Sequence, residues 1–170
     1  MKKLKDQKGF TLTEMLFCVV TLLLLAGVCS MGTDMALNSY NRSLYESNSQ
    51  MLESTLNTYL SDIVRHATFE VDADQKVKTV TNSMYKLKKG RIGVSDDGRI
   101  YLYKDERDTT GVSLLSENVY TKALKIEGFE LRYDKDEDGE YITVFYKIES
   151  TVLDGVAKEC DFKYRIATIY

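Results

Sequence analysis

The sequence predicts an α+β protein in which one long N-terminal helix packs on a C-terminal antiparallel β-sheet of four to five strands. Residues 15–31 form an apolar run without a charged side chain, and apolar residues then recur every three or four positions up to residue 67. After Phe69 apolar and polar residues alternate, which is the two-residue period of a strand. Proline is absent from all 170 residues, so nothing forces a break in the helix.

The first half of the predicted helix has the length and composition of a membrane span. At about 1.5 Å per residue the uncharged run reaches about 26 Å, close to the ~30 Å hydrocarbon core of a bilayer. Four lysines directly precede it: Lys2, Lys3, Lys5 and Lys8. Since positive charge stays on the cytoplasmic side, we expect the N-terminus inside the cell and the C-terminal bulk outside.

The second half of the helix, residues 33–67, is expected to be amphipathic and to rest its apolar stripe on the sheet. This stripe comprises Leu37, Tyr40, Leu44, Leu52, Leu56, Tyr59, Ile63 and Ala67. The two halves together predict a single helix over about residues 11–66. Gly27 and Gly32 are its expected weak points, because glycine is a poor helix former.

Residues 68–170 are expected to form one antiparallel β domain. A turn signal, Asp96-Asp97-Gly98, separates two predicted strands at residues 91–94 and 99–103. Alternation predicts further strands near residues 129–133, 142–148 and 160–166, with Cys160 on the apolar face as a buried free thiol. Residues 71–85 show no clear period, and we expect irregular structure or short strands there.

One acidic residue, Glu14, lies at the start of the apolar run, where a charge is costly unless a partner compensates it. Thr11 and Glu14 match a capping box, in which both side chains satisfy free N–H groups of a helix start. Other kinds of processing do not explain Glu14. A secretory signal peptide cut near residues 28–30, or a lipoprotein signal at Cys29, would discard the helix.

The segment GFTLTE, with Gly9, Phe10 and Glu14 behind a short basic leader, resembles the N-terminus of type IV pilins and pseudopilins. The resemblance covers about thirty residues. It implies that a prepilin peptidase cuts between Gly9 and Phe10, removes residues 1–9 and retains residues 10–32 as the transmembrane and filament-core half of the helix. It further implies methylation of the new Phe10 amine. Glu14 would then pair with the amino terminus of a neighbouring subunit, which supplies the missing counter-charge.

This resemblance implies a pilin-like fold and a structural role without catalysis or a cofactor. The chain would be a minor pilin or pseudopilin of a type IV pilus, a type II secretion system or a competence filament. Its partners would be other pilin subunits, the assembly machinery and, before assembly, the lipid bilayer. It would be made as a single-pass precursor in the cytoplasmic membrane and end in an extracellular filament or pseudopilus. Many pilins have a proline near the position of Met31, and this chain has none.

The alternative is a membrane-anchored or secreted β domain that binds calcium or DNA. Asp134, Asp136, Asp138 and Gly139 have the D-x-D-x-D-G spacing of calcium loops, but Phe145 replaces the glutamate that an EF-hand needs. We therefore expect a solvated acidic hairpin turn and no metal.

A basic segment with Tyr85 beside it contains Lys86, Lys88, Lys89 and Arg91, and we expect an exposed strand edge there rather than a DNA site. A net charge of −3 also disfavours nucleic acid as a partner. His66 is the only histidine and no nucleophile motif accompanies it, so an enzyme is not expected.

Overall fold

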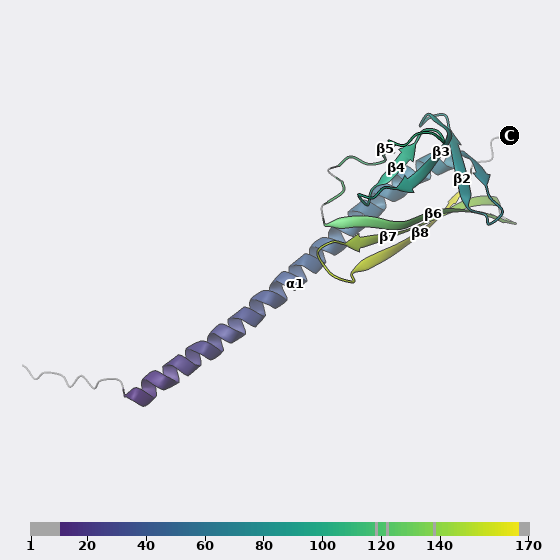
Figure 1. Cartoon of the computed structure of the whole chain (residues 1–170). Coiled ribbons are helices and arrows are strands. Elements are labelled where there is room, and N and C mark those ends of the chain that lie inside the picture. The colour runs from purple at the N-terminus through teal and green to yellow at the C-terminus, as the bar shows by residue number, and fades with distance from the viewer. Residues whose placement is uncertain (1–10, 118, 122, 138, 167–170) are drawn as a thin grey trace, which may run out of the picture. The chain divides into compact units, whose positions relative to one another are not determined.

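A computed structural model describes residues 11–166 of the chain except 118, 122 and 138. It contains one helix, α1 (Leu12–Arg65), followed by eight strands, as Figure 1 shows. The chain divides into two compact units, Met1–Asn41 and Arg42–Tyr170, which we describe separately. The long N-terminal helix and the antiparallel strands confirm the α+β class.

In the first unit the described residues belong almost entirely to α1. The helix begins after Thr11 and continues through Gly27 and Gly32 without a break. A Cβ added at either glycine would meet no atom within 4 Å. The expected weak points are therefore regular helical turns in this structure, and the helix is uninterrupted because no proline removes a backbone donor.

The second unit contains the rest of α1 and two antiparallel sheets. The five-stranded sheet has the order β1-β2-β3-β4-β5, and the three-stranded sheet has the order β6-β7-β8. The strands are β1 (Thr68–Val71), β2 (Val77–Asn82), β3 (Leu87–Val94), β4 (Ile100–Tyr103), β5 (Val112–Ser113), β6 (Leu124–Asp136), β7 (Gly139–Ser150) and β8 (Ala157–Arg165).

The two sheets meet along β6. The backbone N–H of Ile126 donates to the carbonyl of Gly98 at 2.9 Å, and that of Tyr133 donates to Gln75 at 2.8 Å. Gly98 has φ +73, and a Cβ there would lie 2.6 Å from Lys125 Cβ. Only glycine allows both this backbone conformation and such a close approach, which is how the β3–β4 turn rests on β6.

The core of the second unit lies where α1 packs on the sheets. The helix contributes a stripe of side chains with no exposed surface: Leu52, Leu56, Leu60, Ile63 and Val64. The sheets contribute residues such as Ile126, Ile142, Val144 and Ile148. Fully burying one such side chain is worth roughly 1.5–3 kcal/mol. The strands thus hold the C-terminal part of the amphipathic half. Of the predicted stripe, Leu52, Leu56, Ile63 and Ala67 are buried, whereas Leu37, Tyr40, Leu44 and Tyr59 are exposed.

Hydrogen bonds between α1 and the sheets orient the helix on this core. Tyr45 donates through its hydroxyl to the carbonyl of Ile148 at 2.9 Å, and Asn82 donates to the carbonyl of Ile63 near the end of the helix at 2.8 Å. The Asn82 contact satisfies one of the four carbonyls that a helix C-terminus leaves without an intrahelical partner.

The strands differ from expectation in number and arrangement. Four or five strands in one sheet were expected, whereas eight strands form two sheets. The segment 71–85 contains β2, whose Val80 and Asn82 are buried. Its period is obscured by a register shift against β3 between Val80 and Asn82. The hairpins expected at residues 96–98 and 134–139 are both present, although Asp134 and Asp136 belong to β6 and pair with β7.

Candidate functional site

The candidate assembly site begins at the start of α1. The carboxylate oxygen Oε2 of Glu14 accepts from the backbone N–H of Thr11 and from its Oγ1, both at 2.9 Å. In return the backbone N–H of Glu14 donates to Thr11 Oγ1 at 3.3 Å. This reciprocal pattern is the capping box that the sequence indicates. It holds the carboxylate at the helix start, four residues after Phe10, which would follow the expected cut.

The other two members of the predicted processing site, Gly9 and Phe10, lie outside the described residues. The capping hydrogen bonds nevertheless define the position of the Glu14 carboxylate. Its side chain is folded back toward the N-terminal end of the helix, where the free N–H groups and the helix dipole favour negative charge. A free amine created by a cut before Phe10 would be one residue away from Thr11 along the chain.

Within this first unit the large apolar side chains after Glu14 are exposed. Phe17 is 74% exposed, Leu24 68% and Met35 75%. Soluble proteins rarely expose continuous apolar surface on this scale. By length and composition α1 is suited to cross a membrane. Apolar surface on this scale is suited to contact with lipid or with other apolar helices.

Two threonine hydroxyls in this part of the helix are satisfied without water. Thr21 Oγ1 donates to the carbonyl of Phe17 at 2.8 Å, and Thr33 Oγ1 donates to that of Cys29 at 3.0 Å. Such i−4 bonds allow threonine to lie in an apolar environment, where an unsatisfied donor is costly. Cys18 and Cys29 are exposed free thiols on the same helix.

Two described aspartates of the acidic hairpin between β6 and β7 have partners within the chain. Asp134 accepts from Thr143 Oγ1 at 2.8 Å, and Asp136 accepts from Lys163 Nζ at 3.0 Å. Lys135 pairs with Glu140 across the strands at 3.0 Å. In the part of the chain that the structure describes, which omits Asp138, no three metal-ligating side chains come together. The hairpin between β6 and β7 is thus confirmed.

The basic segment after Tyr85 includes the start of β3, and two of its cationic side chains have partners within the chain. Lys89 pairs with Glu70 at 2.7 Å, and the guanidinium of Arg91 lies 4.2 Å from the centre of the Tyr103 ring. Lys86 and Lys89 have positive φ angles of 55 and 54, so the backbone is irregular there. The expected strand edge is wrong, because β3 lies between β2 and β4 and both of its edges are paired. The basic side chains are exposed on the face of an inner strand.

His66 is exposed at the end of α1, beside a shallow cavity of about 380 Å³. In this cavity the Tyr85 hydroxyl donates to Asp62 at 2.6 Å, and this bond raises the pKa of Tyr85 to about 12. Sequence reasoning missed the pair, because no local pattern links residues so far apart in the chain. The contact closes the β2–β3 turn over the helix end.

Cys160 is a buried free thiol, as expected. It is 3% exposed and has no disulfide partner. Burial raises the pKa of its thiol to about 11, which keeps it protonated at neutral pH. A protonated thiol is a poor nucleophile, so Cys160 acts here as a small core residue.

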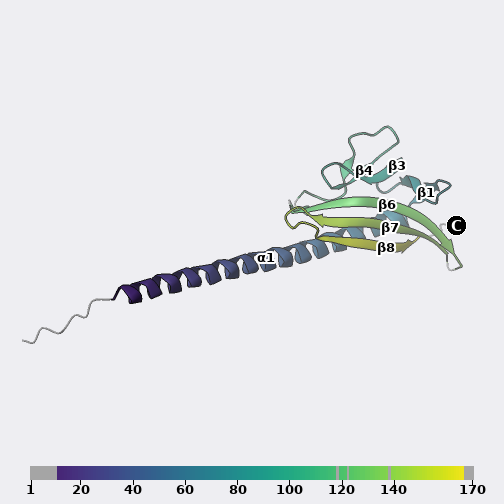
Figure 2. The same ribbon diagram turned by 60° about the horizontal axis from the view of Figure 1, so that its bottom comes forward.

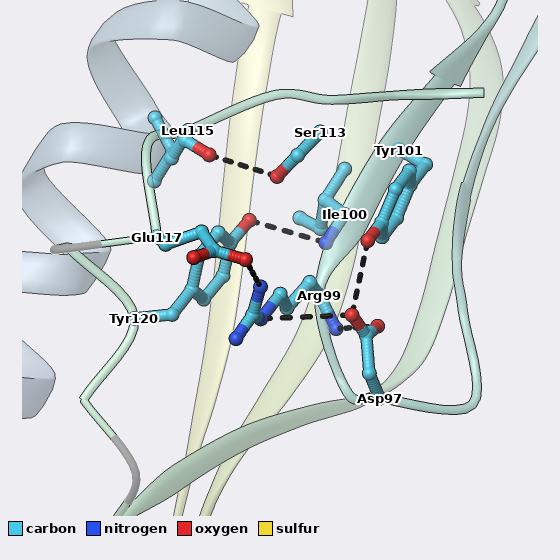
Figure 3. Close-up of polar contacts among 8 residues, drawn as sticks. All are labelled: Asp97, Arg99, Ile100, Tyr101, Ser113, Leu115, Glu117 and Tyr120. Carbon is cyan, nitrogen blue, oxygen red and sulfur yellow. Dashed lines mark hydrogen bonds and ion pairs between the residues drawn. The ribbon is translucent and has the colours of Figure 1, made fainter.

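A polar cluster lies at the β3–β4 turn and fastens the following loop to the sheet, as Figure 3 shows. Arg99 pairs with Glu117 at 3.0 Å, and Tyr101 donates to Asp97 at 3.0 Å. The buried Tyr120 hydroxyl accepts from the backbone N–H of Ile100 at 3.1 Å. The acidic groups are occupied by cation or hydroxyl partners, so the cluster serves to hold the loop.

Replacing Tyr120 with phenylalanine should destabilise the second unit by about 1–3 kcal/mol, because the buried N–H of Ile100 would lose its acceptor. Chemical denaturation of the full chain in detergent measures this. The matched control is Tyr101→Phe, which removes an exposed hydroxyl and should cost less than about 1 kcal/mol. Equal effects of the two substitutions would contradict the proposed role of Tyr120.

Asp108 organises the loop between β4 and β5. Its carboxylate accepts from the backbone N–H groups of Lys104, Thr110 and Gly111 at 3.0–3.1 Å. These bonds lower the pKa of Asp108 from 3.8 to about 2. Because the folded pKa is the lower one, the stabilisation is complete above about pH 4 and is lost as the pH falls toward 2.

The denaturation midpoint of the wild type should therefore decrease between pH 4 and pH 2. The midpoint of the Asp108→Asn variant should decrease less over the same interval. The substituted amide does not titrate, so the difference between the two slopes isolates Asp108. Parallel slopes in wild type and variant would show that the loop contacts do not depend on its charge.

Comparisons with protein-family models, with curated proteins and with solved structures found no match.

Proposed function

We propose that the chain is a structural subunit, a minor pilin or pseudopilin, of a type IV pilus, type II secretion or competence-type filament. The observation that most supports this is the start of α1. A capped glutamate, Glu14, is followed by an exposed apolar helix that continues unbroken into a half packed on the sheets. This arrangement suits a subunit whose helix is first covered by lipid and then by neighbouring helices.

In this proposal a prepilin peptidase removes residues 1–9, and the Phe10 amine is then methylated. Before assembly the chain is a single-pass protein of the cytoplasmic membrane with its N-terminus inside. In the filament Glu14 pairs with the amino terminus of a neighbouring subunit. An amine with a pKa of about 7.7–8.0 and a carboxylate neutralise each other, which lowers the cost of burying either one in an apolar bundle.

The chain contributes no catalysis in this proposal. In the described residues the polar clusters consist of ion pairs and hydrogen bonds that connect strands and loops. His66 is exposed at the end of the helix, and the buried thiol of Cys160 is protonated. The partners are the prepilin peptidase, other pilin subunits and the assembly machinery.

Mass spectrometry of the mature chain tests the processing step. We expect a chain that begins at Phe10, with the added mass of one methyl group on its amine. The control is Gly9→Val, which places a β-branched residue at the cut and should leave the full precursor. A mature chain that begins at Met1 or after residue 28 would contradict the proposal.

A further inference from the structure

The outer edge of β8 is the longest strand edge without a pairing partner in the described residues. In the three-stranded sheet β6 contacts the other sheet, and β7 lies between β6 and β8. The free edge is therefore that of β8, which Figures 1 and 2 show as an outer strand. All nine of its residues pair with β7 without a register shift. Such a long, regular edge is suited to pairing with another strand.

The side chains of β8 alternate strictly between its two faces. Cys160 and Tyr164 are buried against the core and Phe162 is half-buried between them. The four charged residues of the other face are exposed: Glu159, Asp161, Lys163 and Arg165. The exposed face is thus acidic in its first half and basic in its second half.

This order of charges is complementary to itself. If two β8 strands align antiparallel about Phe162, Glu159 faces Arg165 of the other copy and Asp161 faces its Lys163. The two-fold symmetry repeats both pairs, so opposite charges meet at all four exposed positions. On the other face Phe162 meets its own copy, and aromatic cross-strand pairs are stabilising.

From this complementarity we infer that β8 pairs antiparallel with β8 of a second copy of the chain, which joins two three-stranded sheets into one six-stranded sheet. Backbone hydrogen bonds supply the affinity, and the charges set the register. Lys163 already contacts Asp136 at 3.0 Å, and in the pair it would connect that carboxylate to Asp161 of the other copy.

The direction of α1 shows which copies can pair. Glu53 contacts Lys158, and Asn57 contacts Tyr164, so the second half of the helix runs in the same direction as β8. In an antiparallel β8 pair these helix halves run in opposite directions. The paired copies are therefore not neighbours in a filament whose helices all point the same way. The inference goes beyond the proposed function and does not depend on it.

Charge variants of the full chain in detergent test the inference by sedimentation. The variant E159K/D161K has a wholly basic face and K163E/R165E a wholly acidic one, so each should dimerise at least about tenfold more weakly than wild type. An equimolar mixture of the two variants should recover dimerisation, because opposite charges again meet at all four positions. Dimerisation of the wild type should also weaken with added salt.

The control D96K/E106K makes the same change in net charge as E159K/D161K, at exposed positions outside β8, and should dimerise like wild type. Circular dichroism of every variant verifies that it is folded. If the single variants dimerise like wild type, or if the mixture fails to recover dimers, the inference is overturned. Helix association within the detergent would not respond to these substitutions.

Oxidative cross-linking tests the register directly. With Cys18 and Cys29 replaced by serine, Phe162→Cys should form a disulfide-linked dimer, because the two Cβ atoms at the symmetry axis would lie about 5 Å apart. Glu127→Cys, an exposed position on β6, is the matched control and should remain monomeric. Equal cross-linking at the two positions would overturn the β8 register.

Discussion

Glu14→Ala should leave cleavage before Phe10 intact but reduce incorporation into filaments by at least about tenfold. Without the carboxylate, the amino terminus of the neighbouring subunit would be buried in an apolar helix bundle with no counter-charge. Removing one partner of a buried ion pair typically costs about 3–5 kcal/mol, which exceeds the 1.4 kcal/mol that corresponds to tenfold. The measurement is the ratio of assembled to membrane-bound subunit, by immunoblot of sheared filaments and membranes.

Two control variants separate the charge of Glu14 from its capping role. Thr11→Ala removes the hydroxyl that bonds Glu14 and should cost only about 1 kcal/mol of helix stability, so assembly should continue. Glu14→Gln keeps the size of the side chain and loses the charge, so it should fail like the alanine variant. If Glu14→Gln assembles normally while Thr11→Ala does not, capping rather than charge pairing explains the residue.

Leu56→Ala should destabilise the second unit by about 2–5 kcal/mol. Leu56 has no exposed surface and lies in the middle of the helix stripe that packs on the sheets, so truncation leaves a cavity. This is a large fraction of the 5–15 kcal/mol that stabilises a typical domain. The free energy of unfolding is measured by denaturant titration of the full chain in detergent.

Leu44→Ala is the matched control, because it makes the same truncation on the same helix at a side chain that is 41% exposed. We expect it to cost less than about 1 kcal/mol. If both variants were destabilised equally, the helix would not be held by the stripe that contains Leu56. A large loss for Leu56→Ala with normal cleavage at Phe10 would show that processing does not require the packed domain.

Much of the local structure was predictable because its signals are contiguous in the chain. The capping pair Thr11 and Glu14 marked the helix start, and the helix ends at Arg65, one residue before the expected end. The Asp97-Gly98 signal gave the β3–β4 hairpin, and alternation placed Cys160 on the buried face. Each of these depends on residues within a few positions of one another.

The arrangement of the strands was not predictable in the same way. That β6 joins the two sheets depends on the bond between Ile126 and Gly98, and no local pattern relates these residues. The Tyr85–Asp62 contact and the bond from Asn82 to Ile63 likewise connect segments distant in sequence. For β2 the sequence predicted only irregular structure or short strands over residues 71–85, and its bounds were not predictable because a register shift interrupts the strand.

By itself the sequence determined the long unbroken helix, its exposed apolar half, the position of Glu14 and the antiparallel character of the rest. Hydrophobic period, caps and turn residues act over short distances, and a single chain displays them directly. Only the tertiary structure decided that the strands form two sheets joined at β6 and that β8 has a free edge with opposite charges in its two halves. Those features depend on which segments pack together, and that is decided by the fit of buried surfaces and backbone hydrogen bonds between segments far apart in the chain.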